Sequence, residues 1–436
     1  MTTTASVAET PRAADLSSRY ERVRTFTELL AEPLSAEDQT VQTMPDVSPT
    51  KWHRAHTTWF FETFLLGQHQ ADYTPVDPAY GFLFNSYYET VGPRHARPER
   101  GLLTRPGIAA IADYRNAVDD AMAGLLAAEL ETSLSWLVEL GLNHEQQHQE
   151  LLLMDIKHVL GTSPLHPAYR PNDPPTTVAG PTPSWIDHPG GVVKVGFDPS
   201  DGFSFDNEGP IHEVLLQPFA LSTALVTCGQ WLEFMAGGGY ETPELWMSDG
   251  WGTKRSQDWE APEYWYRTDD GWTVHTLTGV RPVDPTEPVC HVSWYEADAF
   301  ARWAGCRLPS EAEWETVAAP RIEQRGEVGG LDVQDLGGDG QGLHPRSAGH
   351  TSTMACDEQW TGAVWQWTSS SYGPYPGFVP AAGAVGEYNG KFMVNQQTLR
   401  GGACITPAGH TRGTYRNFFY PSARWPFCGL RLAVDR

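Results

Sequence analysis

The segment that most constrains the fold is residues 142–158, which contains no glycine or proline and carries two histidines four residues apart, His144 and His148. Leu152 and Ile156 recur behind them at helical spacing, so the segment is predicted to be a helix. Residues four apart lie one turn above each other on a helix, so the two imidazoles can point at one ion. The simpler alternative is a pair of surface histidines.

A second histidine pair favours the metal interpretation. Residues 51–64 carry a heavy aromatic load and are predicted to be a helix that mostly faces a core, and His53 and His56 share one of its faces. One of them would supply a third imidazole, and the other would contact a cap or a substrate. Three neutral imidazoles leave positions open for substrate and dioxygen, and imidazole suits iron, copper and zinc alike. At this point the metal is not decided.

Residues 144–148 also spell His-Glu-Gln-Gln-His, which is formally the motif of zinc metallopeptidases. The extended form of that motif is absent, because Leu151 and Met154 occupy its next positions. A ligand glutamate about twenty residues downstream is also missing, since the first one after Glu150 is Glu208. A peptidase is therefore disfavoured.

Length, charge and cysteine usage bound the remaining possibilities. A chain of 436 residues is long for a single core, so two domains are expected. The formal charge of -24 repels nucleic acid and anionic lipid and suits a small zwitterionic or cationic substrate. The sequence shows no signal peptide or membrane-length apolar run and no closely spaced cysteine pair among its six cysteines, which predicts a cytoplasmic protein with reduced thiols.

Composition changes along the chain indicate four parts. The first half carries helical periods, and together they predict a four-helix bundle with metal ligands on facing helices, at about 16–30, 51–64, 108–131 and 142–158. We expect a disordered tail, the bundle, a proline-rich linker and a second domain, at 1–14, 15–165, 166–185 and 186–436.

The second domain is predicted to be mixed α+β with much irregular loop, because it is rich in glycine, tryptophan and proline and has few long helical periods. A short apolar run at 191–195 is typical of a strand. Ser310 followed by Glu313 forms a capping box. The expected helices lie at about 227–236, 293–304 and 310–318.

These motifs carry a family resemblance. Residues 48–62 together with 144–150 resemble the DinB-like helical bundle of the ergothioneine-biosynthesis sulfoxide synthases. The second half resembles their formylglycine-generating-enzyme-like domain, which has a C-type-lectin-like fold, at 288–297, 306–315, 364–368, 399–402, 416–417 and 429–433. The resemblance covers nearly all of the chain from residue 15 onward and implies an α+β protein of two domains.

The resemblance implies a non-haem iron(II) enzyme of ergothioneine biosynthesis. Its members join a thiol to the imidazole of hercynine, the trimethylammonium betaine of histidine, using dioxygen and leaving a sulfoxide. His56, His144 and His148 match the iron(II) ligands of the family, which leaves His53 as a packed or hydrogen-bonded histidine. Gln147 matches a glutamine near the bound imidazole, and Asn417 matches an asparagine that contacts hercynine.

The sulfur donor is implied by a departure from part of the family. Members that use γ-glutamylcysteine have Trp-Asp after the asparagine, whereas here Asn417 is followed by Phe418 and Phe419. This aromatic pair resembles the cysteine-using subgroup, so the two phenylalanines are expected to line the donor site. Arg424 is expected to pair with the carboxylate of the donor.

Tyr87 and Tyr88 match a tyrosine pair of the same subgroup. A phenol near iron can donate a proton to a reduced-oxygen intermediate, so both are candidate catalytic residues, with loop packing as the simpler interpretation.

Two alternatives to the main hypothesis stay open. The first is an ovothiol-type sulfoxide synthase acting on histidine, and the second is a non-catalytic metal-binding or thiol-stress module. Copper-dependent thiol oxidation is disfavoured, because Cys404 is not followed by a second cysteine before Arg416. The expected partners are small molecules, namely hercynine, cysteine and dioxygen, without nucleic acid or membrane, and the oligomeric state is left open.

Overall fold

The chain forms two compact units in the computed structural model, which describes residues 13–172, 178, 180, 182–325, 330–337, 341–350 and 359–436. The predicted disordered tail lies almost entirely outside these residues, as does part of the predicted linker. The helical unit comprises Met1–Thr162, Phe197–Gly209 and Val379–Gly390. The sheet unit comprises Ser163–Gly196, Pro210–Phe378 and Lys391–Arg436. Two short segments that follow the predicted linker in sequence therefore group with the helices.

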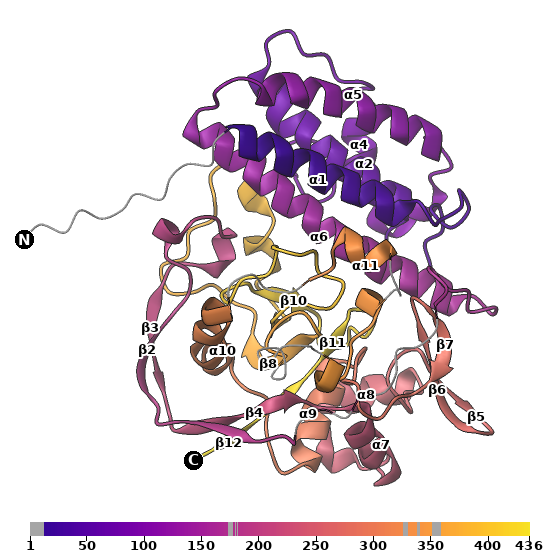
Figure 1. The fold of residues 1–436 in the computed structure, drawn as a ribbon, viewed down its shortest axis with the longest axis vertical. Helices are drawn as coiled ribbons and strands as arrows, with labels where there is room; N and C mark the ends of the chain where they lie inside the picture. The colour runs from indigo at the N-terminus through magenta and orange to yellow at the C-terminus, as the bar shows by residue number, and fades with distance from the viewer. Residues whose placement is uncertain are drawn as a thin grey trace, which may run out of the picture. The chain divides into compact units, whose positions relative to one another are not determined.

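The helical unit packs long helices side by side (Figure 1). Its helices are α1 (Ala13–Ala31), α2 (Thr50–Phe61), α3 (Gly67–His69), α4 (Tyr80–Phe84), α5 (Ile108–Leu126) and α6 (Thr132–Thr162), with one π-helical turn, η1 (Glu62–Leu66), after α2. Helix α6 contacts both α1 and α2, and α2 also contacts α5. The element that carries two of the histidines thus packs directly against the element that carries the third.

Helix α6 begins ten residues before the segment that the histidine pattern marked, and α5 ends five residues earlier than predicted. Position 141, inside α6, requires a glycine, because a Cβ atom there would come within 2.7 Å of the Phe61 ring. The glycine weakens the local helix signal but lets the aromatic face of α2 approach closely. The core around this contact includes the fully buried Val118, Val138 and Leu142, each contributing about 1.5–3 kcal/mol on burial.

The described part of the sheet unit forms four small sheets. Its strands are β1 (Trp185–His188), β2 (Gly191–Val195), β3 (His212–Leu216), β4 (Phe219–Leu225), β5 (Trp265–Thr268), β6 (Gly271–Thr276), β7 (Gly279–Pro282), β8 (Trp365–Ser371), β9 (Gln397–Arg400), β10 (Asn417–Phe419), β11 (Cys428–Gly429) and β12 (Arg431–Asp435). They pair in the orders β1-β4-β12, β10-β9-β8-β11, β2-β3 and β5-β6-β7. All pairs are antiparallel except β8 with β11.

The helices of the sheet unit are α7 (Cys228–Ala236), α8 (Ser248–Ser256), α9 (Trp294–Trp303), α10 (Glu311–Arg325) and α11 (Val333–Gly337). The predicted capping box is present, with Ser310 Oγ accepting from the Glu313 N–H at 3.2 Å and the Glu313 carboxylate accepting from the Ser310 N–H at 2.7 Å. Helix α8 was not predicted, because two glycines and a polar sequence hide its period. The mixed α+β class with a helical and a sheet-containing part is confirmed.

Two further findings concern the sequence-based expectations. Within the described ranges no helix combines the length and apolar character needed to span a membrane. No disulfide joins any two of the five cysteines that the structure describes, and Cys356 lies outside those residues.

Candidate metal centre

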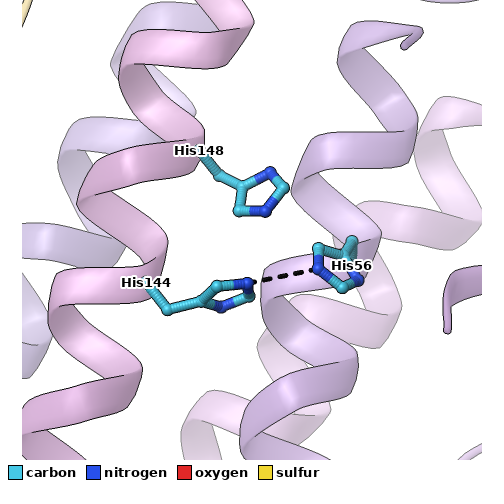
Figure 2. A group of neighbouring side chains, drawn as sticks. All are labelled: His56, His144 and His148. Carbon is cyan, nitrogen blue, oxygen red and sulfur yellow. Dashed lines mark hydrogen bonds between the residues drawn. The ribbon is translucent and has the colours of Figure 1, made fainter. Parts of the chain in front are cut away.

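Three histidines of the helical unit point toward one another. Figure 2 shows His144 and His148 projecting from consecutive turns of α6 and His56 projecting from α2 to meet them. One nitrogen from each lies within 4.8 Å of the nitrogens chosen from the other two, and His56 Nε2 lies 3.2 Å from His144 Nε2. This is the set that the sequence resemblance selected.

The ring of His56 is held in place on both faces. Trp52 stacks on it at 4.6 Å between ring centroids, and Trp59 lies nearly parallel at 5.6 Å. Its Nδ1 lies 2.6 Å from the carbonyl oxygen of Phe84 at the end of α4. Because a carbonyl only accepts, Nδ1 carries the hydrogen and Nε2 presents its lone pair toward the other two histidines.

His148 is oriented by a chain of two buried groups. Its Nδ1 lies 2.9 Å from His53 Nδ1, and His53 Nε2 lies 3.0 Å from the Asp155 carboxylate, which also accepts from the Ser48 N–H at 2.8 Å. An ionised carboxylate only accepts, so His53 donates from Nε2 and accepts at Nδ1 from His148. This assignment leaves His148 Nε2 unprotonated on the side of the cluster. His53 is thus hydrogen-bonded rather than part of the three-nitrogen set, as expected.

The low pKa values of the three histidines favour the binding of a metal cation. Burial lowers the pKa of His144 to about 4, although the charge of Glu145 opposes the shift. Burial, followed by the neighbouring histidines, also holds the pKa values of His56 and His148 well below the ordinary range. All three imidazoles are therefore neutral at physiological pH, which is the protonation state that binds metal.

The donor set fits a divalent transition metal. Two nitrogens bound at about 2.1 Å and at right angles lie about 3 Å apart, close to the 3.2 Å between His56 and His144. Figure 2 marks this pair as a hydrogen bond to the lone pair of His56 Nε2, and a bound cation would take the place of the shared hydrogen. Three imidazoles without a carboxylate suit iron, copper or zinc, and they leave coordination positions for other ligands.

Glu145 is not available as the base of a metallopeptidase. Its carboxylate is fully buried on another face of α6 and accepts from Arg24 Nη1 at 2.9 Å, Arg115 Nη2 at 3.0 Å and Thr27 Oγ1 at 2.6 Å. Burial would raise its pKa, but the two guanidinium groups outweigh burial and lower the pKa to about 2. The carboxylate therefore joins α6 to α1 and α5, and the peptidase alternative fails on geometry.

A pocket of about 450 Å³, open to solvent, borders His144 within the helical unit. Gln147 and Tyr88 line it, as two of the sequence-predicted site residues. Tyr88 is buried against Trp59 and Phe64, and burial raises the pKa of its phenol well above the ordinary value. The phenol thus stays protonated at neutral pH.

Tyr87 is placed differently from its neighbour. Its hydroxyl accepts from Arg97 Nη1 at 2.5 Å, and its ring lies 5.9 Å from that of Tyr388. Tyr88 lines the pocket beside His144 whereas Tyr87 does not, so the structure separates the two tyrosines that the sequence could not rank.

The pocket also contains residues that the sequence analysis missed. Trp136 lies about two turns before His144 on α6, and the two short segments Phe197–Gly209 and Val379–Gly390 supply Phe205, Asp206, Tyr388 and Asn389. These segments are short and lack a periodic pattern. The one available signal was the density of aromatic and carboxyl residues in 203–208.

The remaining sequence-predicted residues lie in the sheet unit. Asn417, Phe418 and Phe419 form β10, which pairs with β9, and Phe418 stacks on Tyr372 at 4.1 Å. Asn417 Oδ1 accepts from the Phe418 N–H at 2.8 Å.

Arg424 is buried among carboxylates of the sheet unit. Its Nε lies 3.1 Å from Glu296, its Nη1 lies 3.4 Å from Glu263, and its guanidinium lies over the ring of Trp259 at 4.5 Å. These contacts give the side chain a structural role, and binding of a donor carboxylate would have to compete with them.

Comparison with known proteins assigns both parts of the chain. Residues 19–152 match the DinB superfamily, and residues 171–334 match the sulfatase-modifying factor enzyme 1-like domain. The hercynine oxygenase of Mycolicibacterium thermoresistibile is 32% identical over 414 residues, covering 90% of this chain and 88% of the relative. That of Mycobacterium tuberculosis is 32% identical over 405 residues, covering 90% and 92%.

The second half alone also matches proteins of another name. A formylglycine-generating enzyme of Streptomyces coelicolor is 31% identical over 258 residues, which is 50% of this chain and 77% of that protein. The two hercynine oxygenases match this chain over 90% of its length and so across both domains, whereas the formylglycine-generating enzyme matches 50% of it. The chain belongs to the hercynine oxygenase family, the two-domain enzymes of ergothioneine biosynthesis that its sequence resembles.

Proposed function

We propose that this protein is a non-haem iron(II) sulfoxide synthase that joins cysteine to the imidazole of hercynine with dioxygen, giving hercynylcysteine sulfoxide. The observation that carries the proposal is the set of three neutral imidazoles, the buried His56 and His144 and the half-buried His148, beside a pocket lined by Gln147 and Tyr88. Membership of the hercynine oxygenase family supports it. In this proposal the three histidines hold iron(II).

The reaction balances without an external reductant. Joining an imidazole carbon to sulfur removes one C–H and one S–H hydrogen and two electrons, and oxidising the sulfide to a sulfoxide removes two more. Dioxygen accepts all four electrons, with one oxygen atom kept in the sulfoxide and the other released as water. Iron(II), when bound, supplies the activation of dioxygen that this stoichiometry needs.

The residues of the chain have separate tasks in this scheme. Gln147 lies on the ligand helix and orients the substrate imidazole in the pocket, and Asn417 is retained as a hercynine contact. Tyr88 supplies a proton to reduced oxygen, because burial keeps its phenol protonated and it lines the pocket beside His144. Tyr87 holds the loop through Arg97 and assists Tyr88.

Cysteine is the proposed sulfur donor. Phe418 and Phe419 stand where γ-glutamylcysteine-using members have Trp-Asp, so the carboxylate that would meet the amino group of the larger donor is missing. Arg424 stays a candidate for the donor carboxylate, although Glu296 and Glu263 already engage it. A cytoplasmic location, where cysteine and reduced thiols coexist, completes the proposal.

The test is product formation. The protein is loaded with iron(II) without oxygen, mixed with hercynine and cysteine, exposed to air and analysed by mass spectrometry. Parallel reactions replace cysteine by γ-glutamylcysteine and hercynine by histidine. We expect the hercynylcysteine sulfoxide, with a higher kcat/KM for cysteine than for γ-glutamylcysteine. Failure to form an adduct with either thiol would reject the function, and a γ-glutamylcysteine preference would reject the donor assignment.

A further inference from the structure

A short loop after α4, the tyrosine loop (residues 85–92), carries both candidate tyrosines. The buried Asn85 closes it from inside, because its Nδ2 donates to two carbonyl oxygens of the loop, at 3.0 and 3.1 Å, and its Oδ1 accepts from the Tyr88 N–H at 3.2 Å. Glu89 and Thr90 form the exposed side of the loop, directly after Tyr88. These bonds of Asn85 do not reach that side.

The exposed side of the tyrosine loop is held by Glu387, which stands far away in the sequence. One carboxylate oxygen, Oε2, accepts from the Glu89 N–H at 3.0 Å, and the other, Oε1, accepts from the Thr90 N–H at 3.1 Å. The Thr90 hydroxyl also donates to Oε1. Hydrogen bonds to a carboxylate are about twice as strong as those between neutral groups. A carboxylate that receives two consecutive N–H groups therefore fixes the course of the backbone next to Tyr88.

Glu387 belongs to a segment that is itself anchored in the helical unit, Val379–Gly390, which we call the strap. Its Val385 packs against the core of the helices. Near its end, the side chain of Asn389 donates to Asp206 at 2.6 Å. The strap is thus fixed on both sides of Glu387, and it can hold the tyrosine loop against the helices.

The same carboxylate favours the protonated form of the phenol beside it. Burial, followed by Tyr388 and the Glu387 carboxylate, raises the pKa of Tyr88 well above its ordinary value. A phenol must carry its hydrogen to act as a proton donor. The position and the charge of Glu387 therefore both support the state of Tyr88 that can donate.

We propose that Glu387 is a positioning residue for Tyr88, and that the strap holds this phenol where it can deliver a proton during formation of the sulfoxide adduct. The inference rests on the proposed function, because it concerns the same reaction. Adduct formation releases one oxygen atom of dioxygen as water, so protons must reach the reduced oxygen. Oxidation of cysteine to its sulfinate puts both oxygen atoms on sulfur and needs no such delivery. A displaced phenol therefore favours the sulfinate.

The first measurement needs neither metal nor turnover. Hydrogen exchange of the metal-free full chain, read by mass spectrometry, reports on the peptide that spans residues 85–92. We expect Glu387→Ala to speed its exchange at least about tenfold, and Glu387→Gln, which keeps one acceptor oxygen, to lie between this variant and the wild type. The matched control is Glu89→Gln, because it removes a charge from the same loop, one that pairs with Arg94, and keeps the N–H that Glu387 receives. Its exchange should equal that of the wild type.

The second measurement is the ratio of adduct to cysteine sulfinate in the iron-loaded protein with hercynine, cysteine and air. Because a displacement of about 1 Å can cost about a hundredfold in rate, we expect this ratio to fall at least about tenfold in Glu387→Ala, with kcat for the adduct reduced and KM for hercynine little changed. The exposed Thr90 guards against misfolding of that variant: Thr90→Val should shift the ratio in the same direction, and Thr90→Ser, which keeps the hydroxyl, should restore it. In a Tyr88→Phe background Glu387→Ala should change the ratio no further, because Glu387 acts through Tyr88.

A purely structural role predicts a different pattern. Both products would then fall together, and a ratio that stays unchanged in Glu387→Ala and Thr90→Val would overturn the inference, even if exchange is faster. Unchanged exchange in Glu387→Ala would overturn it as well. A wild type that forms no adduct with either thiol rejects the proposed function, and hydrogen exchange then decides separately whether Glu387 holds the tyrosine loop.

Discussion

Replacing His53 with phenylalanine tests whether the chain from Asp155 through His53 to His148 prepares the metal site. Phenylalanine keeps an aromatic ring at this closely packed position, where His53 is only 2% exposed, but it removes both hydrogen bonds, at 2.9 Å to His148 and at 3.0 Å to Asp155. His148 Nδ1–H then has no acceptor, and the ring loses the contact that fixes its orientation and tautomer. Loss of such a partner costs about 10–100-fold in metal affinity, equivalent to about 1.4–2.7 kcal/mol.

The assay is competition with a chelator for iron(II), or for cobalt(II), whose visible absorption reports the ligand geometry. We expect the dissociation constant to rise within that range while the site still fills at excess metal. Replacement of the proposed ligand His56 by phenylalanine should abolish stoichiometric binding. His158→Phe is the matched control, because His158 lies on the same helix and its Nδ1 bonds to Thr43.

An unchanged dissociation constant for His53→Phe, with thermal unfolding showing the protein folded, would refute this reasoning. The buried carboxylate of Asp155 would lose one of its two hydrogen bonds in the variant. A fall in melting temperature alone, without loss of metal affinity, would mean that the hydrogen bonds from Asp155 through His53 to His148 stabilise the fold and not the metal site.

Three further outcomes are expected. Glu145→Gln should destabilise the protein by about 3–5 kcal/mol, because it breaks a fully buried ion-pair network, yet it should keep the metal; an unchanged melting temperature would contradict this. Tyr88→Phe should divert product from the sulfoxide adduct toward cysteine sulfinate more than Tyr87→Phe does, and equal ratios by mass spectrometry would return both to packing. Burial would raise the pKa of Glu287, but a neighbouring histidine and arginine hold it below its ordinary 4.5, so stability from this group is present above about pH 4.5 and is lost as pH falls through the lower folded pKa. Glu287→Gln should therefore flatten the acid side of the stability profile, and an unaltered profile would argue against the pairing.

Local patterns were sufficient to locate the long helices and the ligand face of α6. The spacing of His144 and His148 fixes their common direction once the segment is helical, because helix geometry is independent of what surrounds it. The choice of His56 over His53 came from the resemblance alone. Only the structure shows the reason, which is that Phe84 orients one ring while Asp155 engages the other.

The wall of the pocket could not be predicted from local pattern. Asp206 and Tyr388 stand far from the histidines in sequence, in short segments without a period, and they join the helical unit only through tertiary contacts. Burial of Glu145 against Arg24 and Arg115 was equally hidden. A sequence motif records residue types at positions on a helix, whereas the partner on each face depends on how the other helices pack.

The most direct test of the central claim is a single turnover of the iron-loaded protein with hercynine and cysteine under ¹⁸O₂. Because dioxygen supplies the sulfoxide oxygen in the proposed stoichiometry, we expect hercynylcysteine sulfoxide carrying one ¹⁸O atom, seen by mass spectrometry, and the second labelled atom in water. Exchange should be excluded by incubating unlabelled product in labelled water. A product of cysteine sulfinate with no carbon-sulfur adduct, or an adduct without label, would contradict the account.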